Sequence, residues 1–158
     1  PMKAYLTVLF SGILLLVGTT ASFAIELAAL DRVSVLMPKA EVVAILGAPD
    51  KVTDLEGLAV ELYQIHNAAP LLSVGLFYEH ERALAGNTLI FKGNTAAATL
   101  ARLKQHGFRT LEEKGDYLRL EGKDDDTGRP VIVTISRLED LTTVTTFEKA
   151  FYEQRSNR

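Results

Sequence analysis

The feature that most constrains the fold is a short helical pattern that ends abruptly, "PKAEVVAILGAP" at 38–49. Pro38 suits the first turn of a helix, where a backbone N–H has no partner within the helix. Gly47 favours the left-handed conformation just past a helix end, and Pro49 prevents the helix from continuing. One face of this helix is apolar through Val42, Val43, Ile45 and Leu46. The pattern predicts a short amphipathic helix that packs on a sheet and then leads into a strand.

Three β-rich runs follow this helix, each bounded by turn residues. They are "LAVELYQIH" at 58–66, "LLSVGLFYEH" at 71–80 and "NTLIFKG" at 87–93. The turns between them are "NAAP" and "ALAG". Before the first run, "APDKVTDLE" forms an arm between Gly47 and Gly57. The first half of the chain therefore reads as a helix, an arm and three strands.

The same plan begins again in the second half. "NTAAATLARLKQHG" at 94–107 has Asn94 or Thr95 as a helix cap and stops at Gly107. Further strand patterns follow in "FRTLEEKG", "DYLRLEG", "RPVIVTISRL" and "LTTVTTF", with "KDDDTG" as a hairpin turn. The tail at 148–158 fits either a continuing strand or a terminal helix.

These patterns predict a single α+β domain over 25–158. We expect an antiparallel β-sheet meander with one or two helices packed on one face. The repeated plan indicates a duplicated α-βββ unit, with subunits at 33–93 and 94–152. The alternative is the ordinary alternation of helices and strands found in any α+β protein.

The first 24 residues differ in character from the rest of the chain. After "PMK", no charged residue occurs from Ala4 to Ile25. A positive start, an apolar middle and small residues at Ser22 and Ala24 are typical of a secretory signal peptide over 1–24. Pro1 stands before the first methionine, Met2, and we interpret it as a cloning scar. The alternative is a hydrophobic anchor within 4–30, which would be the chain's contact with a membrane. These interpretations predict a periplasmic or secreted location, or a membrane-anchored one.

Composition limits the functions that such a domain can have. A formal net charge of −3 over 158 residues gives no sign of a nucleic-acid groove. The sequence has no cysteine, which excludes disulfides, a thiolate nucleophile, cysteine-ligated zinc and lipid attachment at a cysteine. With 47% hydrophobic residues, the chain has enough apolar surface for one core.

The helix and the strand after it carry a family resemblance. The matching residues are Met37, Glu41, Val42, Leu46, Gly47, Pro49 and Asp50, followed by Tyr63 on the strand. This pattern resembles the SmpA/OmlA (BamE-like) module of the small outer-membrane-assembly lipoproteins, well over 33–66 and loosely over 67–92. The tandem arrangement resembles the β-lactamase inhibitor protein family. Leu36 stands where the family has glycine, and the lipid-anchoring cysteine of those lipoproteins is missing. The resemblance implies a protein-binding platform whose partner is another envelope protein.

The densest polar cluster is "YEHER" at 78–82. His80 beside Glu81 could serve as a base or a metal ligand, but no HxH or HExxH spacing supports a metal site. A solvated strand end that enters a hairpin explains the same residues. The serines lack a GxSxG context, and "KDDDTG" lacks the glutamate of a calcium loop. We therefore predict no catalytic, cofactor-binding or metal-binding residues.

Tyrosines supply the candidate binding residues. A sheet with helices on one face leaves its other face open, and tyrosines on such a face often mark partner-binding surfaces. The candidates are Tyr63, Tyr78, Tyr117 and Tyr152. The sequence thus predicts a non-catalytic, protein-binding module of the cell envelope. The alternative is a small periplasmic enzyme or ligand-binding protein with a pocket near His80 and Glu81.

Cleavage of the signal peptide can be tested directly. Because the small residues end at Ala24, we expect the exported protein to begin at Ile25. Mass spectrometry of the native protein from the envelope fraction measures this end. A mass that still includes residues 1–24 would support the retained anchor instead.

Overall fold

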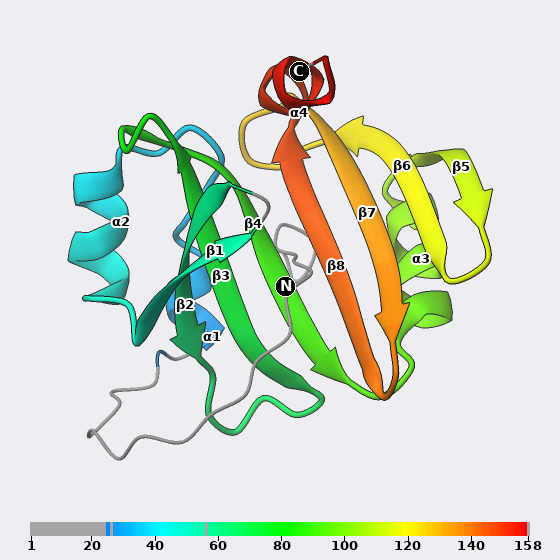
Figure 1. Ribbon diagram of the computed structural model, residues 1–158, viewed down its shortest axis with the longest axis horizontal. Coiled ribbons are helices and arrows are strands. Elements are labelled where there is room, and N and C mark those ends of the chain that lie inside the picture. The colour runs from blue at the N-terminus through cyan, green and yellow to red at the C-terminus, as the bar shows by residue number, and fades with distance from the viewer. Residues whose placement is uncertain (1–24, 26, 56, 158) are drawn as a thin grey trace.

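The computed structural model describes residues 25, 27–55 and 57–157 (Figure 1). The predicted signal peptide at 1–24 lies outside the described residues. Within the described part of the chain, no helix has both the length and the apolar character needed to cross a bilayer.

The described strands form one antiparallel sheet in the order β1-β2-β3-β4-β8-β7-β6-β5. The strands are β1 Lys51–Leu55, β2 Leu58–Gln64, β3 Leu71–Glu79, β4 Ala83–Lys92, β5 Arg109–Lys114, β6 Tyr117–Lys123, β7 Pro130–Leu138 and β8 Leu141–Glu148. The helices are α1 Leu27–Leu30, α2 Lys39–Leu46, α3 Ala96–Gln105 and α4 Lys149–Ser156. The chain is therefore an α+β protein, as the sequence predicts.

The strand order divides the sheet into two similar halves. In each half a helix, α2 or α3, precedes a four-stranded meander. The last strands of the two meanders pair with each other, from Gly86 opposite Phe147 to Lys92 opposite Leu141. The repeat unit thus has four strands instead of the three predicted for the first half. The additional strand, β1, is the run interpreted as an arm, and it pairs with β2 along its whole length.

The main core lies between the sheet and three helices. α1, α2 and α3 contribute Leu30, Val42 and Leu103 to one cluster of buried apolar residues. The strands contribute alternate residues to it, such as Val74 on β3 and Val144 on β8. The expectation of one or two helices on this face was too low, because α1 packs there as well (Figure 1).

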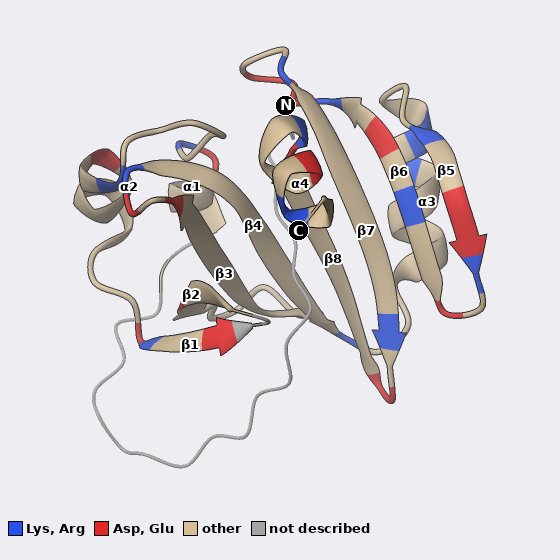
Figure 2. Ribbon diagram, turned by 45° about the horizontal axis from the view of Figure 1, so that its top comes forward, with Lys and Arg blue, Asp and Glu red and all other residues tan. Residues whose placement is uncertain are grey.

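The tail forms a fourth helix, α4, on the opposite face of the sheet (Figures 1 and 2). Its start is capped by Glu148, whose Oε2 accepts a hydrogen bond of 2.9 Å from the backbone N–H of Phe151. Phe151 then packs on Phe77, with ring centroids 5.8 Å apart, and joins a second apolar cluster with Val60 and Leu62 of β2. The cap and this one aromatic anchor explain why the ambiguous tail becomes a helix.

The two outer strands of the sheet differ. β5 has a bulge between Thr110 and Glu112, and its side chains are mostly exposed and charged. β1 pairs with β2 without a register shift and exposes Val52. Irregularity and charge discourage further strand pairing, so β5 is the better protected edge.

Two glycines give a test of how the sheet packs. A Cβ at Gly86 would clash with the backbone oxygen of Thr146 and with the ring of Phe77. A Cβ at Gly122 would clash with the ring of Phe108, a buried side chain of the main core, and the three nearest atoms all belong to that ring. We expect Gly86→Ala to cost about 3 kcal/mol and Gly122→Ala less.

Denaturant unfolding of both variants measures these costs. Adding Phe108→Leu should recover stability for Gly122→Ala, because it removes the obstructing ring. Adding Phe77→Leu should not rescue Gly86→Ala, because the clash with backbone remains. If both glycine variants lose the same stability, and the second substitution rescues both, the close approach of Gly86 to β8 is contradicted.

Candidate functional site

The sheet face that carries α4, here called the α4 face, brings polar side chains of several strands into rows. Residues opposite each other on paired strands point to the same side of a sheet. One row crosses five strands through Thr88, Thr145, Thr134, Arg119 and Glu112. The next row contains Ile90, Thr143, Ser136, Tyr117 and Lys114. The α4 face therefore has hydroxyl groups at its centre and charged or aromatic groups on the β5–β6 side.

The hydroxyl groups of these rows differ in exposure. Ser73, Thr88, Thr143 and Thr145 are buried, with Thr88 at 0% exposure. Thr134, Ser136, Tyr117 and Arg119 are only half-buried. The accessible part of the α4 face thus lies over β5, β6 and β7.

α4 connects the aromatic cluster to this accessible part. Phe147 lies between Phe77 and Tyr152, with centroid distances of 5.1 Å and 5.4 Å. The Arg119 Nη1 donates a hydrogen bond of 3.2 Å to the Tyr152 hydroxyl. The second terminal nitrogen of Arg119, Nη2, lies 3.3 Å from a carboxylate oxygen of Glu112. Arg119 is therefore held between α4 and β5 in a fixed position.

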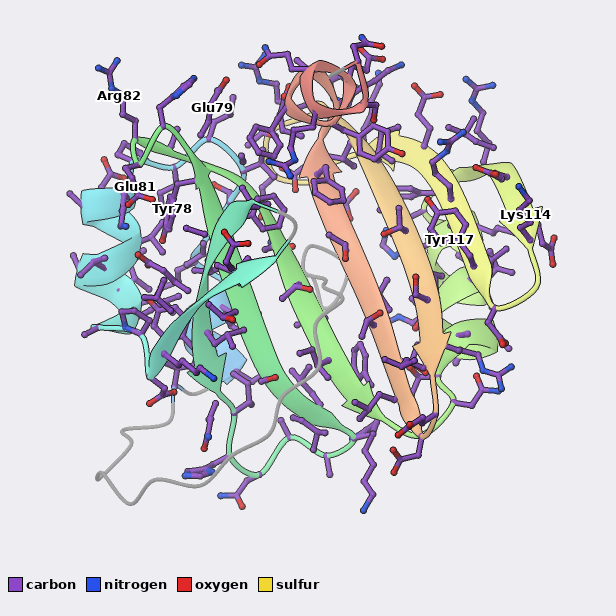
Figure 3. The ribbon with its side chains drawn as sticks, viewed as in Figure 1. Tyr78, Glu79, Glu81, Arg82, Lys114 and Tyr117 are labelled. Atoms are coloured by element: carbon purple, nitrogen blue, oxygen red, sulfur yellow. The ribbon has the colours of Figure 1, made fainter. Side chains whose placement is uncertain are left out.

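Tyr117 completes this cluster from the neighbouring position on β6. It lies opposite Lys114 on β5 (Figure 3). On its other side it lies opposite Ser136 on β7. Burial and the nearby Tyr152 hydroxyl raise the pKa of Tyr117 to about 12, although Arg119 opposes the shift. The structure thus brings together two of the four tyrosines that the sequence singles out, and both are half-buried.

The other two tyrosines lie on the opposite face, and their predicted surface position was wrong. Tyr63 is 1% exposed and Tyr78 is 5% exposed, both within the main core. The Tyr63 hydroxyl donates a hydrogen bond of 3.1 Å to the carbonyl of Gly47, just past the end of α2. Burial raises the pKa of both hydroxyls. Strand alternation directs both rings toward α2, so they hold this helix on the sheet.

A charged cluster lies at the start of α2. It includes Glu81, one of the two residues near which the alternative interpretation of the sequence places a pocket. Lys39 forms ion pairs with Glu61 and Glu81, and its Nζ lies 4.8 Å from the centroid of the Tyr78 ring. Burial acts to lower the pKa of Lys39, but the two carboxylates outweigh it and raise the pKa. The cluster ties α2 to β2 and to the β3–β4 turn.

His80 and Glu81 occupy the two central positions of that turn. Their φ angles are 50° and 59°, and the N–H of Arg82 donates to the carbonyl of Glu79 at 3.0 Å. Both residues are exposed. Glu81 is labelled in this turn in Figure 3. The interpretation of "YEHER" as a strand end that enters a hairpin is confirmed. Among the described residues, no three His, Asp or Glu side chains gather closely enough to hold a metal ion.

The acidic run "KDDDTG" forms the hairpin turn that the sequence predicts. Asp124 Oδ2 accepts hydrogen bonds of 2.9 Å from the backbone N–H of Thr127 and 2.6 Å from its hydroxyl. Gly128 supplies a positive φ of 68°. Asp124 therefore stabilises its own turn.

Arg119, Thr134 and Ser136 are not among the residues that the sequence singles out. A signal for the last two was present, since hydroxyl residues alternate with apolar ones in "VTIS" at 133–136. Such alternation places them on one face of a strand. Arg119 carries no comparable local signal, because its partners Glu112 and Tyr152 come from other elements.

Comparison with known proteins identifies no relative. The chain matches no protein-family model, no curated protein and no solved structure. The function must therefore be inferred from the geometry of the site.

The titration of Tyr117 tests the geometry of this cluster. Tyr152→Phe should lower the pKa of Tyr117 below about 12, because it removes the neighbouring hydroxyl. The pKa should still stay above the ordinary tyrosine value, because burial is the larger cause. NMR of ring-labelled tyrosine, with Tyr117→Phe to assign the signal, measures this pKa. An unchanged value would contradict the contact between the two hydroxyls.

Proposed function

We propose that this chain is an exported cell-envelope protein that binds another protein through the accessible part of its α4 face. The observation that carries the proposal is the grouping of Tyr117, Tyr152 and Arg119, half-buried, on a sheet face that α1, α2 and α3 do not cover. Tyrosine and arginine are enriched at the centres of protein interfaces, where a large side chain combines apolar contact with a polar end.

The cluster is already held in one arrangement before any partner arrives. Arg119 contacts both Tyr152 and Glu112, and Tyr152 also packs on Phe147. Side chains fixed in this way lose less conformational entropy on binding. Tyr117 and Arg119 lie on strand β6, and side chains on strands are positioned more precisely than side chains on loops.

Glu121, which follows Arg119 on the same face of β6, is poorly suited to act as a base. Glu121 forms ion pairs with Arg109 and Lys149, and these hydrogen bonds lower its pKa below the ordinary glutamate value. A carboxylate with a lowered pKa is a weak base near neutral pH. The resemblance of 33–66 to the SmpA/OmlA module, whose members use the fold as a protein-binding platform, also supports the proposal.

Site-specific photo-crosslinking tests this function. A photoreactive phenylalanine analogue at Tyr117 should form a discrete adduct with an envelope protein in living cells. The same analogue at Gln105, an exposed residue of α3, is the matched control on the other side of the sheet. We expect an adduct at Tyr117 that is absent at Gln105 and is lost when Ser136→Arg obstructs the neighbouring position.

Two results would contradict the proposal. One is the same set of adducts at Tyr117 and Gln105, which would indicate random collision. The other is no adduct at Tyr117 while the protein is folded and exported, as shown by its thermal unfolding and its location.

A further inference from the structure

The two faces of the sheet carry opposite charge. Strand register assigns each charged strand residue of the described chain to one face. On the α4 face the basic residues are Lys51, Lys92, Arg109, Lys114, Arg119 and Lys123, and the acidic ones are Glu79, Glu112 and Glu121. On the opposite face the basic residue is Arg137, and the acidic ones are Asp54, Glu61 and Glu113. Glu148, the last residue of β8, is not counted with either face because its carboxylate caps α4. The α4 face is thus net positive in a protein whose net charge is −3.

The positive charge that is free to attract a partner comes from lysines. Arg109 and Arg119 are paired with Glu121 and Glu112 within the face. The four lysines of the face, Lys51, Lys92, Lys114 and Lys123, are exposed and form no ion pair with any described residue. Both acidic residues on the β5–β6 side are already neutralised by their ion pairs. The unbalanced charge on this side of the sheet is therefore positive.

These lysines stand at the margins of the α4 face. Each stands at a strand end: Lys51 begins β1, and Lys92, Lys114 and Lys123 end β4, β5 and β6. Lys114 lies directly opposite Tyr117. Charged side chains around an aromatic and hydroxyl centre form the arrangement of a protein interface, with a polar rim and a less polar core. A nucleic-acid groove has a continuous basic track instead.

We propose that the partner contacts the accessible α4 face with an acidic polypeptide segment, rich in Asp or Glu. Its carboxylates pair with the rim lysines, while its backbone and side chains contact Tyr117, Thr134 and Ser136. The inference rests on the proposed protein-binding function and specifies the chemistry of the partner. Rim charges of this kind mainly accelerate association and make it depend on salt.

Binding of poly-L-glutamate to the purified protein tests the charge preference, with a Gly-Ser peptide of equal length as the neutral probe. Fluorescence anisotropy measures both affinities at low and high salt. We expect poly-L-glutamate to bind, to bind less tightly as salt rises, and to bind better than the Gly-Ser peptide. Duplex DNA and phosphatidylglycerol vesicles are the competing probes. If either binds more tightly than poly-L-glutamate, the choice of an acidic polypeptide is overturned.

Charge reversal locates the effect on the α4 face. The triple variant Lys92→Glu, Lys114→Glu and Lys123→Glu should weaken poly-L-glutamate binding about tenfold. A matched control reverses Arg32, Arg82 and Lys104, which are exposed and lie off this face, and should change affinity by less than about twofold. An equal loss in both triples would show that net charge alone attracts the probe and would overturn the proposal.

A milder variant guards against misfolding. Replacing the same three lysines by glutamine removes charge without placing new carboxylates beside Glu112, and it should cause a smaller loss in the same direction. The proposed function is tested separately by the adduct at Tyr117. If that adduct forms equally well in the charge-reversed triple, the acidic-segment inference fails and the protein-binding function stands.

Discussion

The pairing of β4 with β8 is the interaction on which the rest of the structure depends. It joins two helix-plus-meander halves into one sheet through an unbroken register from Gly86 to Lys92. Each half alone would leave an unpaired strand at this position. The same contact places Phe147 beside Phe77, which gives α4 an aromatic surface to pack on. The second core and the tyrosine cluster both follow from this one ladder.

The local sequence predicted the positions of most helices and strands. It predicted less well how many strands each half contains and which face of the sheet each residue occupies. Pro38, Gly47 and Gly107 mark the ends of α2 and α3 correctly because helix ends have strong residue preferences. β1 was missed because "KVTDL" is short and its pairing with β2 is a tertiary property. The helical tail was ambiguous because α4 depends on the contact of Phe151 with residues of the first half.

The candidate site was half predictable for a related reason. Alternation shows which residues share a strand face, but not which face receives the helices. Tyr63 and Tyr78 therefore looked equivalent to Tyr117 and Tyr152. In the structure α2 covers the first pair, whereas Tyr152 belongs to α4 and Tyr117 lies on β6, on the face that α4 occupies. The charge difference between the faces was hidden for the same reason. The charge difference becomes visible only when the strand register is followed across the whole sheet, from β1 to β4 and then through β8, β7 and β6 to β5.

The unequal edges of the sheet restrict how this protein can associate with itself. Fibre growth by strand addition needs two receptive edges on every molecule, one to join the chain of copies and one to extend it. Here the bulge and charges of β5 disfavour pairing at one end, which leaves β1 as the more receptive edge. Strand addition in such a molecule therefore favours a closed pair of sheets over a growing fibre.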